Sequence, residues 1–397
     1  MLRILFRLVL ATAFVASAGP ACSGSSKTAK KTKKSKKGSN EVRALLAEAR
    51  DDAKNGEYDD ADKKYADAYG KSKDFDILEE RVDFLIHAGK ATKAVEVAKT
   101  YYDAQVSDSA GWALYAEALL AAQKGPEALE VADQLIQFNG QDPVGHEKKG
   151  RALILMEKNE DGLEELRKAT QLDPKSSTYH RSLGLALNKL GKTEESALEF
   201  RTALKSAPDD AEAHVLLGMA LRGMQEYDDA KTFLDKAIAL DPRNGRAYFE
   251  LGVLYNAQKK QADAEIAFSR AVQLSPNESL FWYAYGEIYR VQERFDEAIS
   301  AYKKAIEIDP PYPKAMQKLG LLLTERKQYD EAEMILTQAV RKEPKYAPTY
   351  FTLGALYAAK RKSKQAIENY QKFLELSPKT DPDRDRAQQA IKELKRR

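Results

Sequence analysis

Residues 211–244 read AEAHVLLGMALRGMQEYDDAKTFLDKAIALDPRN, and this stretch decides the fold. Its apolar residues recur at i, i+3, i+4 and i+7 in two runs, the spacing that gathers side chains on one face of a helix. A short polar turn separates the runs. Asp241-Pro242 ends the second run, because proline cannot continue a helix. The stretch therefore predicts a pair of helices joined by a turn.

The same pattern recurs along the chain with a fixed step of 34 residues. Seven prolines and seven glycines keep this step: Pro174, Pro208, Pro242, Pro276, Pro310, Pro344 and Pro378, and Gly150, Gly184, Gly218, Gly252, Gly286, Gly320 and Gly354. A fixed period of this length is typical of stacked repeats, in which each pair buries its apolar face only against its neighbours. A glycine inside a helix costs about 1 kcal/mol relative to alanine. We therefore expect these glycines to allow close approach between helices.

The best-matched unit is 279–312, in which residue 279 is position 1. It carries Trp282, Tyr285-Gly286, Tyr289, Ala298, Tyr302, Ala305 and Pro310 at positions 4, 7–8, 11, 20, 24, 27 and 32. This pattern resembles the tetratricopeptide repeat (TPR). The resemblance covers seven well-matched units in residues 143–380 and three divergent units in 42–142. It implies an all-α TPR helix-turn-helix solenoid, a right-handed superhelix whose first helices line the concave wall.

Residues 381–397 predict one more helix. Ala387, Ala390, Ile391 and Leu394 fall at i, i+3, i+4 and i+7, and charged residues occupy the other side. A helix of this kind would cover the apolar face that the last repeat leaves exposed. We therefore expect a C-terminal capping helix.

Residues 1–21 predict an export signal of the lipoprotein type. Arg3 and Arg7 precede the apolar stretch 8–16, which is too short to span a bilayer. Small residues and then Cys22, the sole cysteine, follow. This resembles the lipobox of bacterial lipoproteins, which implies lipidation of Cys22 and, with Ser23 after it, an outer-membrane lipoprotein facing the periplasm. The alternative is ordinary cleavage after Ala18, which leaves Cys22 as an unmodified thiol.

Residues 22–41 are rich in lysine and contain no large apolar side chain, so they predict a disordered tether. Residues 1–38 carry a charge of +9, which leaves −6 for the rest of the chain. The tether either stays solvated or contacts anionic lipid or polymer in the envelope. The mildly acidic body lacks the basic surface of a nucleic-acid-binding protein. Nucleic-acid binding through Lys27–Lys37 is also disfavoured for an exported chain.

No catalytic motif stands out, so we expect neither an enzyme nor a cofactor, metal or small-molecule substrate. His146, His180 and His214 do step by 34 residues, at position 4. Packed helices lie about 8–10 Å apart, whereas zinc needs ligand nitrogens at about 2.0–2.1 Å. These histidines are therefore expected to fill the aromatic slot between helices.

In TPR relatives, positions 5 and 12 of each first helix face the concave wall. Aromatic and arginine side chains dominate binding hot spots, and Asn and Arg can bond an extended peptide. The predicted peptide- or protein-binding patch is Arg181, Asn188, Arg222, Phe249, Asn256, Tyr283, Arg290 and Phe351. The alternative is a wall without one high-affinity site.

These features together predict a non-catalytic scaffold. We expect a lipid anchor in the bacterial envelope and a concave face that binds peptide segments or partner proteins to assemble or localise an envelope machine. The alternative is an accessory TPR subunit of a glycosyltransferase or peptidoglycan-hydrolase complex, in which any activity comes from the partner.

Overall fold

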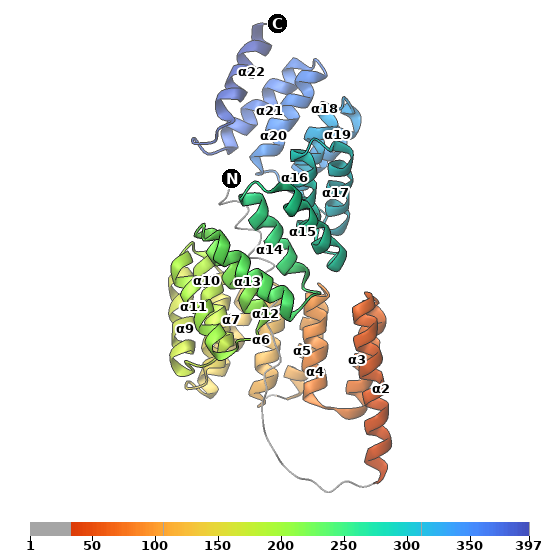
Figure 1. The fold of residues 1–397 in the computed structure, drawn as a ribbon, viewed down its shortest axis with the longest axis vertical. Coiled ribbons are helices and arrows are strands. Elements are labelled where there is room, and N and C mark those ends of the chain that lie inside the picture. The colour runs from red at the N-terminus through yellow and green to blue at the C-terminus, as the bar shows by residue number, and fades with distance from the viewer. Residues whose placement is uncertain (1–32, 106, 311, 397) are drawn as a thin grey trace. The chain divides into compact units, whose positions relative to one another are not determined.

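The computed structural model describes residues 33–105, 107–310 and 312–396. Within these ranges the chain forms 21 α-helices and no strands, which confirms the predicted all-α fold (Figure 1). The helices are α2 (Lys33–Asn55), α3 (Tyr58–Ser72), α4 (Phe75–His87), α5 (Ala91–Ala104), α6 (Ser109–Ala121), α7 (Gly125–Phe138), α8 (Pro143–Leu155), α9 (Asn159–Leu172), α10 (Ser177–Lys189), α11 (Thr193–Ser206), α12 (Ala211–Gly223), α13 (Tyr227–Leu240), α14 (Gly245–Ala257), α15 (Gln261–Leu274), α16 (Ser279–Val291), α17 (Phe295–Ile308), α18 (Pro313–Glu325), α19 (Tyr329–Lys342), α20 (Ala347–Ala359), α21 (Ser363–Leu376) and α22 (Arg384–Arg396).

The N-terminal segments predicted from sequence are only partly described. The predicted signal peptide, Cys22 and tether residues 23–32 lie outside the described residues. Helix α2 begins at Lys33, so residues 33–41, which composition assigns to a disordered tether, are helical here. Lysine is a good helix former, and the later part of α2 is anchored by packing on α3. Composition alone does not predict this extension. It shows that residues 33–41 can bury little apolar surface, but it does not show that they extend the helix that follows them.

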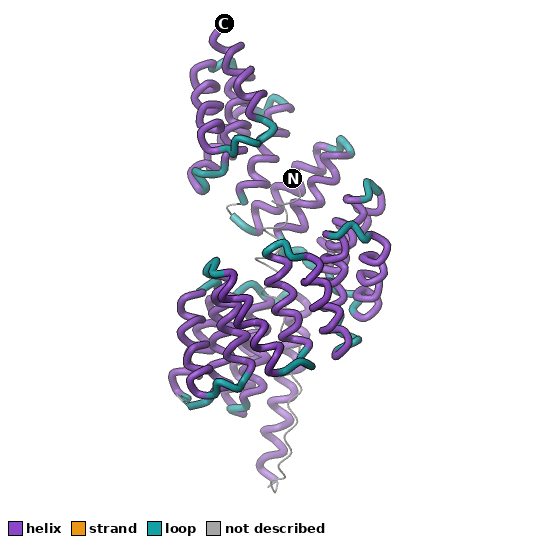
Figure 2. The backbone as a smooth tube through the Cα atoms, turned by 90° about the vertical axis from the view of Figure 1, so that its left-hand side faces the viewer, coloured by secondary structure: helices purple, strands orange, loops and turns teal. Residues whose placement is uncertain are grey.

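The helices group into two units, which are described separately. The first ends at Glu226 and holds α2–α12, and the second begins at Tyr227 and holds α13–α22. Short loops join successive helices in both units (Figure 2). The strongest packing joins the two helices of a pair, such as α8 with α9 and α14 with α15.

In six of the repeats, the start of the first helix is capped by the last residue of the repeat before it. Six such residues accept a hydrogen bond from a backbone N–H two or three positions on: Asp74, Asp108, Asp142, Ser176, Asp210 and Asn244. They repeat with the 34-residue step. Each cap satisfies a donor that the first turn of a helix cannot pair internally. The repeat therefore encodes the helix boundary as well as the core.

The repeated glycines lie where two helices of a pair meet. A Cβ added at Gly184 would lie 2.5 Å from the Phe200 ring, and one at Gly286 would lie 2.7 Å from the Tyr302 ring. The same contact, between position 8 and position 24, recurs at Gly150, Gly252, Gly320 and Gly354. No real Cβ fits at such distances, so the helices approach this closely only because the first carries glycine.

The C-terminal helix α22 packs on α21. Ala387, on the buried face of α22, is fully buried. The Arg384 guanidinium donates hydrogen bonds to the carbonyl oxygens of Leu374 and Ser377, at 2.6 and 2.9 Å. These carbonyls end α21 and have no partner within that helix. The predicted capping helix is thus present over Arg384–Arg396, and it pairs backbone groups as well as covering apolar surface.

We expect Gly286→Val to destabilise the second unit by about 1–3 kcal/mol, because the added carbons overpack against Tyr302. Gly70→Ala in α3 is the control, since a Cβ there meets nothing within 4 Å and alanine favours a helix by up to about 1 kcal/mol. Urea unfolding followed by circular dichroism measures both. Equal midpoints for Gly286→Val and the unmodified protein would contradict this account of the contact.

Candidate functional site

First helices of neighbouring pairs contact one another. In the first unit the contacts run from α4 to α6, α8, α10 and α12 in turn, and in the second unit α18 contacts α20. Within a unit the first helices therefore lie side by side and form a wall. Positions 5 and 12 of these helices carry the eight residues predicted to bind a partner.

The three predicted residues of the first unit differ in exposure. Arg181 in α10 is buried, and its Nη1 donates to Asp210 Oδ2 at 2.8 Å. Asp210 also caps α12, so Arg181 ties α10 to the start of the next first helix. Asn188 is fully buried, with its amide nitrogen 4.0 Å from Met219 Sδ. Arg222, near the end of α12, keeps part of its side chain exposed.

The three predicted aromatic residues of the second unit take part in ring packing. Phe249 stacks on Phe281 at a centroid distance of 4.5 Å. Tyr283 lies 5.9 Å from Tyr302 of α17, and burial raises the pKa of its hydroxyl. Phe351 makes edge contacts with the second-helix rings Tyr370 and Phe373, at 5.6 and 5.2 Å. These contacts give the three rings a structural role in addition to any role in binding.

Asn256 is exposed, and Arg290 is half-buried beside Glu287. The Arg290 Nε and Nη2 each donate to a Glu287 oxygen at 3.2 Å, and Lys318 of α18 lies 3.5 Å away. Burial acts to raise the pKa of Glu287, but Lys318 and Arg290 outweigh it and hold the pKa below its ordinary value. Partner binding by the eight residues stays a prediction.

The sequence-based selection missed a buried charge cluster in the first unit. Arg151 in α8 binds Glu117 of α6 through two hydrogen bonds, at 2.6 and 2.9 Å, and Glu147 at 3.1 Å. Lys148 Nζ lies 2.5 Å from Glu117, and Ser182 of α10 donates to Glu147 at 2.7 Å. The cluster therefore links three successive first helices.

Burial acts to raise the pKa of both carboxyl groups of this cluster. The nearby cations Arg151 and Lys148 outweigh that effect and hold the pKa of Glu117 and Glu147 below the ordinary value. A signal for this cluster exists in the sequence. Glu117 and Arg151 are one period apart, both at position 9, so opposite charges at one repeat position indicate a bridge between neighbouring first helices.

Asp83 in α4 is one period before Glu117 and is half-buried. Burial, reinforced by the negative charges of Glu117 and Glu79, raises the pKa of Asp83 to about 7. This end of the wall therefore holds a carboxyl group whose protonation state changes near neutral pH.

The three histidines at position 4 contact neighbouring helices and the end of the preceding 34-residue repeat. His146 and His180 each contact a glutamate of the following second helix at 2.6 Å. His180 Nε2 also lies 3.0 Å from the Pro174 carbonyl oxygen, and His214 Nε2 lies 2.9 Å from that of Pro208. Trp282 makes the equivalent bond to Pro276. Among the described residues there is no group of three or more His, Cys, Asp or Glu that could hold a metal ion.

Known proteins share this architecture. The crystal structure of yeast Tom70 superposes with a TM-score of 0.53 at 18% identity, over 90% of this chain and 96% of that one. The Cut9-Hcn1 heterotetramer of APC/C superposes with a TM-score of 0.57 at 16% identity, over 76% of this chain and 59% of that one. At these identities the likeness shows the fold alone, a helical repeat protein. A search of curated proteins finds no significant match.

Two family models identify the repeat. The model described as tetratricopeptide repeat matches residues 46–110, 148–211, 189–223 and 215–279. The model described as the TPR domain of cytochrome c-type biogenesis protein H matches residues 276–384. Together they cover more than half of the 397 residues, so the chain belongs to the TPR family. In the described part of the chain, no helix is both long and apolar enough to cross a membrane.

We expect Arg151→Met to destabilise the first unit by about 3 kcal/mol at pH 7, because it removes the guanidinium from two buried carboxylates. The pKa of Glu117 is lowered on folding, so its stabilising contribution is present above the unfolded value of about 4.3. The loss caused by the substitution should therefore stay nearly constant from pH 7 to about 5 and shrink as the pH falls below about 4.3. Urea unfolding at several pH values measures it.

Arg167→Met is the matched control. Arg167 pairs with Glu195 at 3.1 Å, and about half of each side chain is exposed. Surface pairs of this kind contribute about 0–1 kcal/mol. Similar losses in both variants, or a loss in Arg151→Met that is independent of pH, would show that the buried cluster does not stabilise the wall.

Proposed function

We propose that this protein is a non-catalytic interaction scaffold whose first-helix wall binds peptide segments or partner proteins. TPR proteins generally act as protein-interaction scaffolds, and membership of the family is the observation that carries the proposal. The exposure of wall residues in the second unit supports the proposal. There Asn256 is exposed, and Arg290 and Phe351 keep part of their surface open.

The proposed cellular setting is the bacterial envelope. A short apolar stretch, 8–16, is followed by small residues, then by the sole cysteine, Cys22, and then by a lysine-rich segment. A lipid on Cys22 would hold the TPR body at the outer membrane, facing the periplasm. Tethering raises the effective concentration of the wall for other envelope proteins, so weak contacts suffice for assembly of a machine there.

Site-specific photo-cross-linking in cells tests the binding role of the wall. A photoreactive residue at Asn256 should capture a defined partner, and Arg290→Ala should reduce that capture several-fold. The same photoreactive residue at Lys236, which is exposed on the second helix α13, is the control. Identical captured proteins from both positions would argue against the wall as the binding surface.

Labelling with radioactive palmitate tests the anchor separately. The unmodified protein should incorporate label and fractionate with the outer membrane, whereas Cys22→Ser should do neither, because it removes the only thiol. If Cys22→Ser is labelled as strongly as the unmodified protein, lipidation at this residue is rejected. The cross-linking result would still stand.

A further inference from the structure

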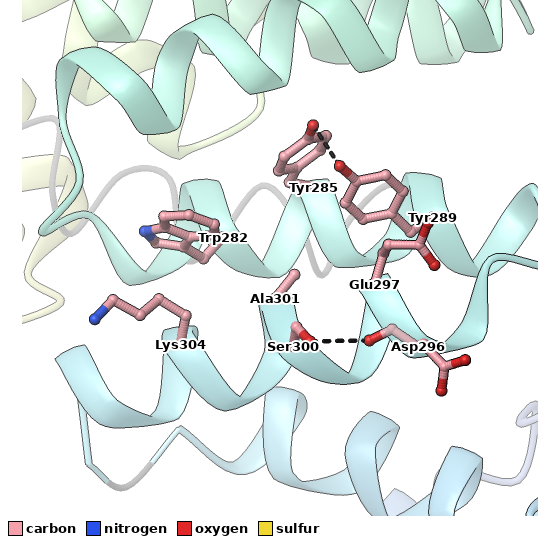
Figure 3. Close-up of a pocket in the computed structure, with 8 residues that line it drawn as sticks. All are labelled: Trp282, Tyr285, Tyr289, Asp296, Glu297, Ser300, Ala301 and Lys304. Atoms are coloured by element: carbon pink, nitrogen blue, oxygen red, sulfur yellow. Dashed lines mark hydrogen bonds between the residues drawn. The ribbon is translucent and has the colours of Figure 1, made fainter.

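A second candidate surface lies in the second unit, on a face of α16 other than the one bearing Tyr283 and Arg290. Trp282, Tyr285 and Tyr289 lie at i, i+3 and i+7, so one side of α16 carries three rings in a row, of which Tyr285 is buried and the other two are partly exposed (Figure 3). Across from them, α17 presents the small residues Ser300 and Ala301. Small side chains opposite large rings leave an open groove between the two helices.

The three rings are held in place by their neighbours. Trp282 Nε1 donates to the Pro276 carbonyl oxygen at 2.8 Å, and the Tyr289 hydroxyl donates to that of Tyr285 at 2.5 Å. The Arg294 guanidinium lies 4.4 Å from the centroid of the Tyr289 ring. A ligand would therefore meet rings whose orientation is already fixed, which lowers the entropic cost of binding.

The groove continues on the other side of Tyr285. That residue also lines a depression between α14 and α15, together with Tyr248, Tyr255 and Ile266. Ile266 is 71% exposed, which is unusual for a large apolar side chain at a helix surface. Aromatic side chains of α14 and α16 thus line two depressions that share Tyr285.

The groove is electrostatically asymmetric along α17. Lys304 lies near Trp282 at one end, and Asp296 and Glu297 lie near Tyr289 at the other (Figure 3). Asp296 pairs with Arg326 at 2.7 Å, but its side chain is 77% exposed, and Glu297 pairs with Arg294 at the surface. Exposed pairs contribute little, so these carboxylates stay available to a cation from a partner.

We propose that this groove binds an extended, proline-rich segment of another protein, with a basic residue placed at the Asp296 and Glu297 end. Proline-rich chains adopt the polyproline II conformation before binding and dock in aromatic-lined grooves. The opposite charges at the two ends select the direction of the chain. A uniformly basic segment fits less well, because Lys304 repels it. This surface is separate from the first-helix wall, so it stands or fails independently of the proposed function.

The chain offers a direct reporter, because it contains two tryptophans. Trp112→Phe leaves Trp282 as the only one, and Trp112 lies in the first unit, in α6. The probe is a twelve-residue peptide with prolines at two of every three positions and two arginines at one end. Titration into the full-length Trp112→Phe protein should give a saturable shift of the Trp282 emission.

A matched pair of variants in this background tests the location. Ser300→Arg fills the groove and should weaken binding about tenfold or more. Thr232→Arg is the control, since Thr232 is exposed at the same repeat position two periods earlier and makes the same hydroxyl-to-carbonyl bond as Ser300. Asp296→Asn with Glu297→Gln should weaken the arginine-bearing peptide about threefold or more and leave a peptide without arginines unchanged.

Three results would overturn the proposal. They are no emission shift with the peptide, equal weakening by Ser300→Arg and Thr232→Arg, and equal binding of a lysine-rich peptide without proline, such as the chain's own segment 27–37. A shift with a chitin oligosaccharide but not with the peptide would identify a glycan site and would also reject the proposal. Circular dichroism of each variant confirms that the helices are retained.

Discussion

The contact between the position 8 glycine and the large side chain at position 24 sets the geometry on which the other contacts depend. Because Gly184 has no side chain, the Phe200 ring lies directly against the backbone of α10. The same contact in other pairs fixes how closely the two helices approach and therefore where their outer faces lie. A pair held at this distance presents regular surfaces to the next pair, which is the condition for stacking repeats.

The sequence period predicts more of the structure than the helix pairs alone. The caps Asp74, Asp108 and Asp142 occupy one repeat position, as do the ring donors His180 and Trp282, whose hydrogen bonds reach the carbonyl six residues earlier. Each is predictable because its partner is local and repeats with it. The start of α2 was not predictable in this way, because residues 33–41 have no counterpart elsewhere in the array.

The candidate site was harder to predict, because a repeat position tells which face of a helix a residue occupies and not what covers it. Phe249 and Arg181 share position 5, yet one stacks on a ring and the other forms an ion pair with Asp210. Those partners belong to the following repeat unit or its cap. The Glu117–Arg151 bridge was open to prediction, since both residues occupy position 9, but only a comparison of charges between successive units reveals it.

The α16 groove differs from the helix pair that follows it at three repeat positions. Positions 4, 7 and 11 of α18 hold Met316, Leu319 and Leu323, which are all buried. In α16 the same positions hold Trp282, Tyr285 and Tyr289, and Trp282 and Tyr289 remain partly exposed. Aliphatic side chains are therefore sufficient to build the pair. The partly exposed rings of Trp282 and Tyr289 add aromatic surface that a ligand can contact, and aromatic area of this kind is what binding surfaces use.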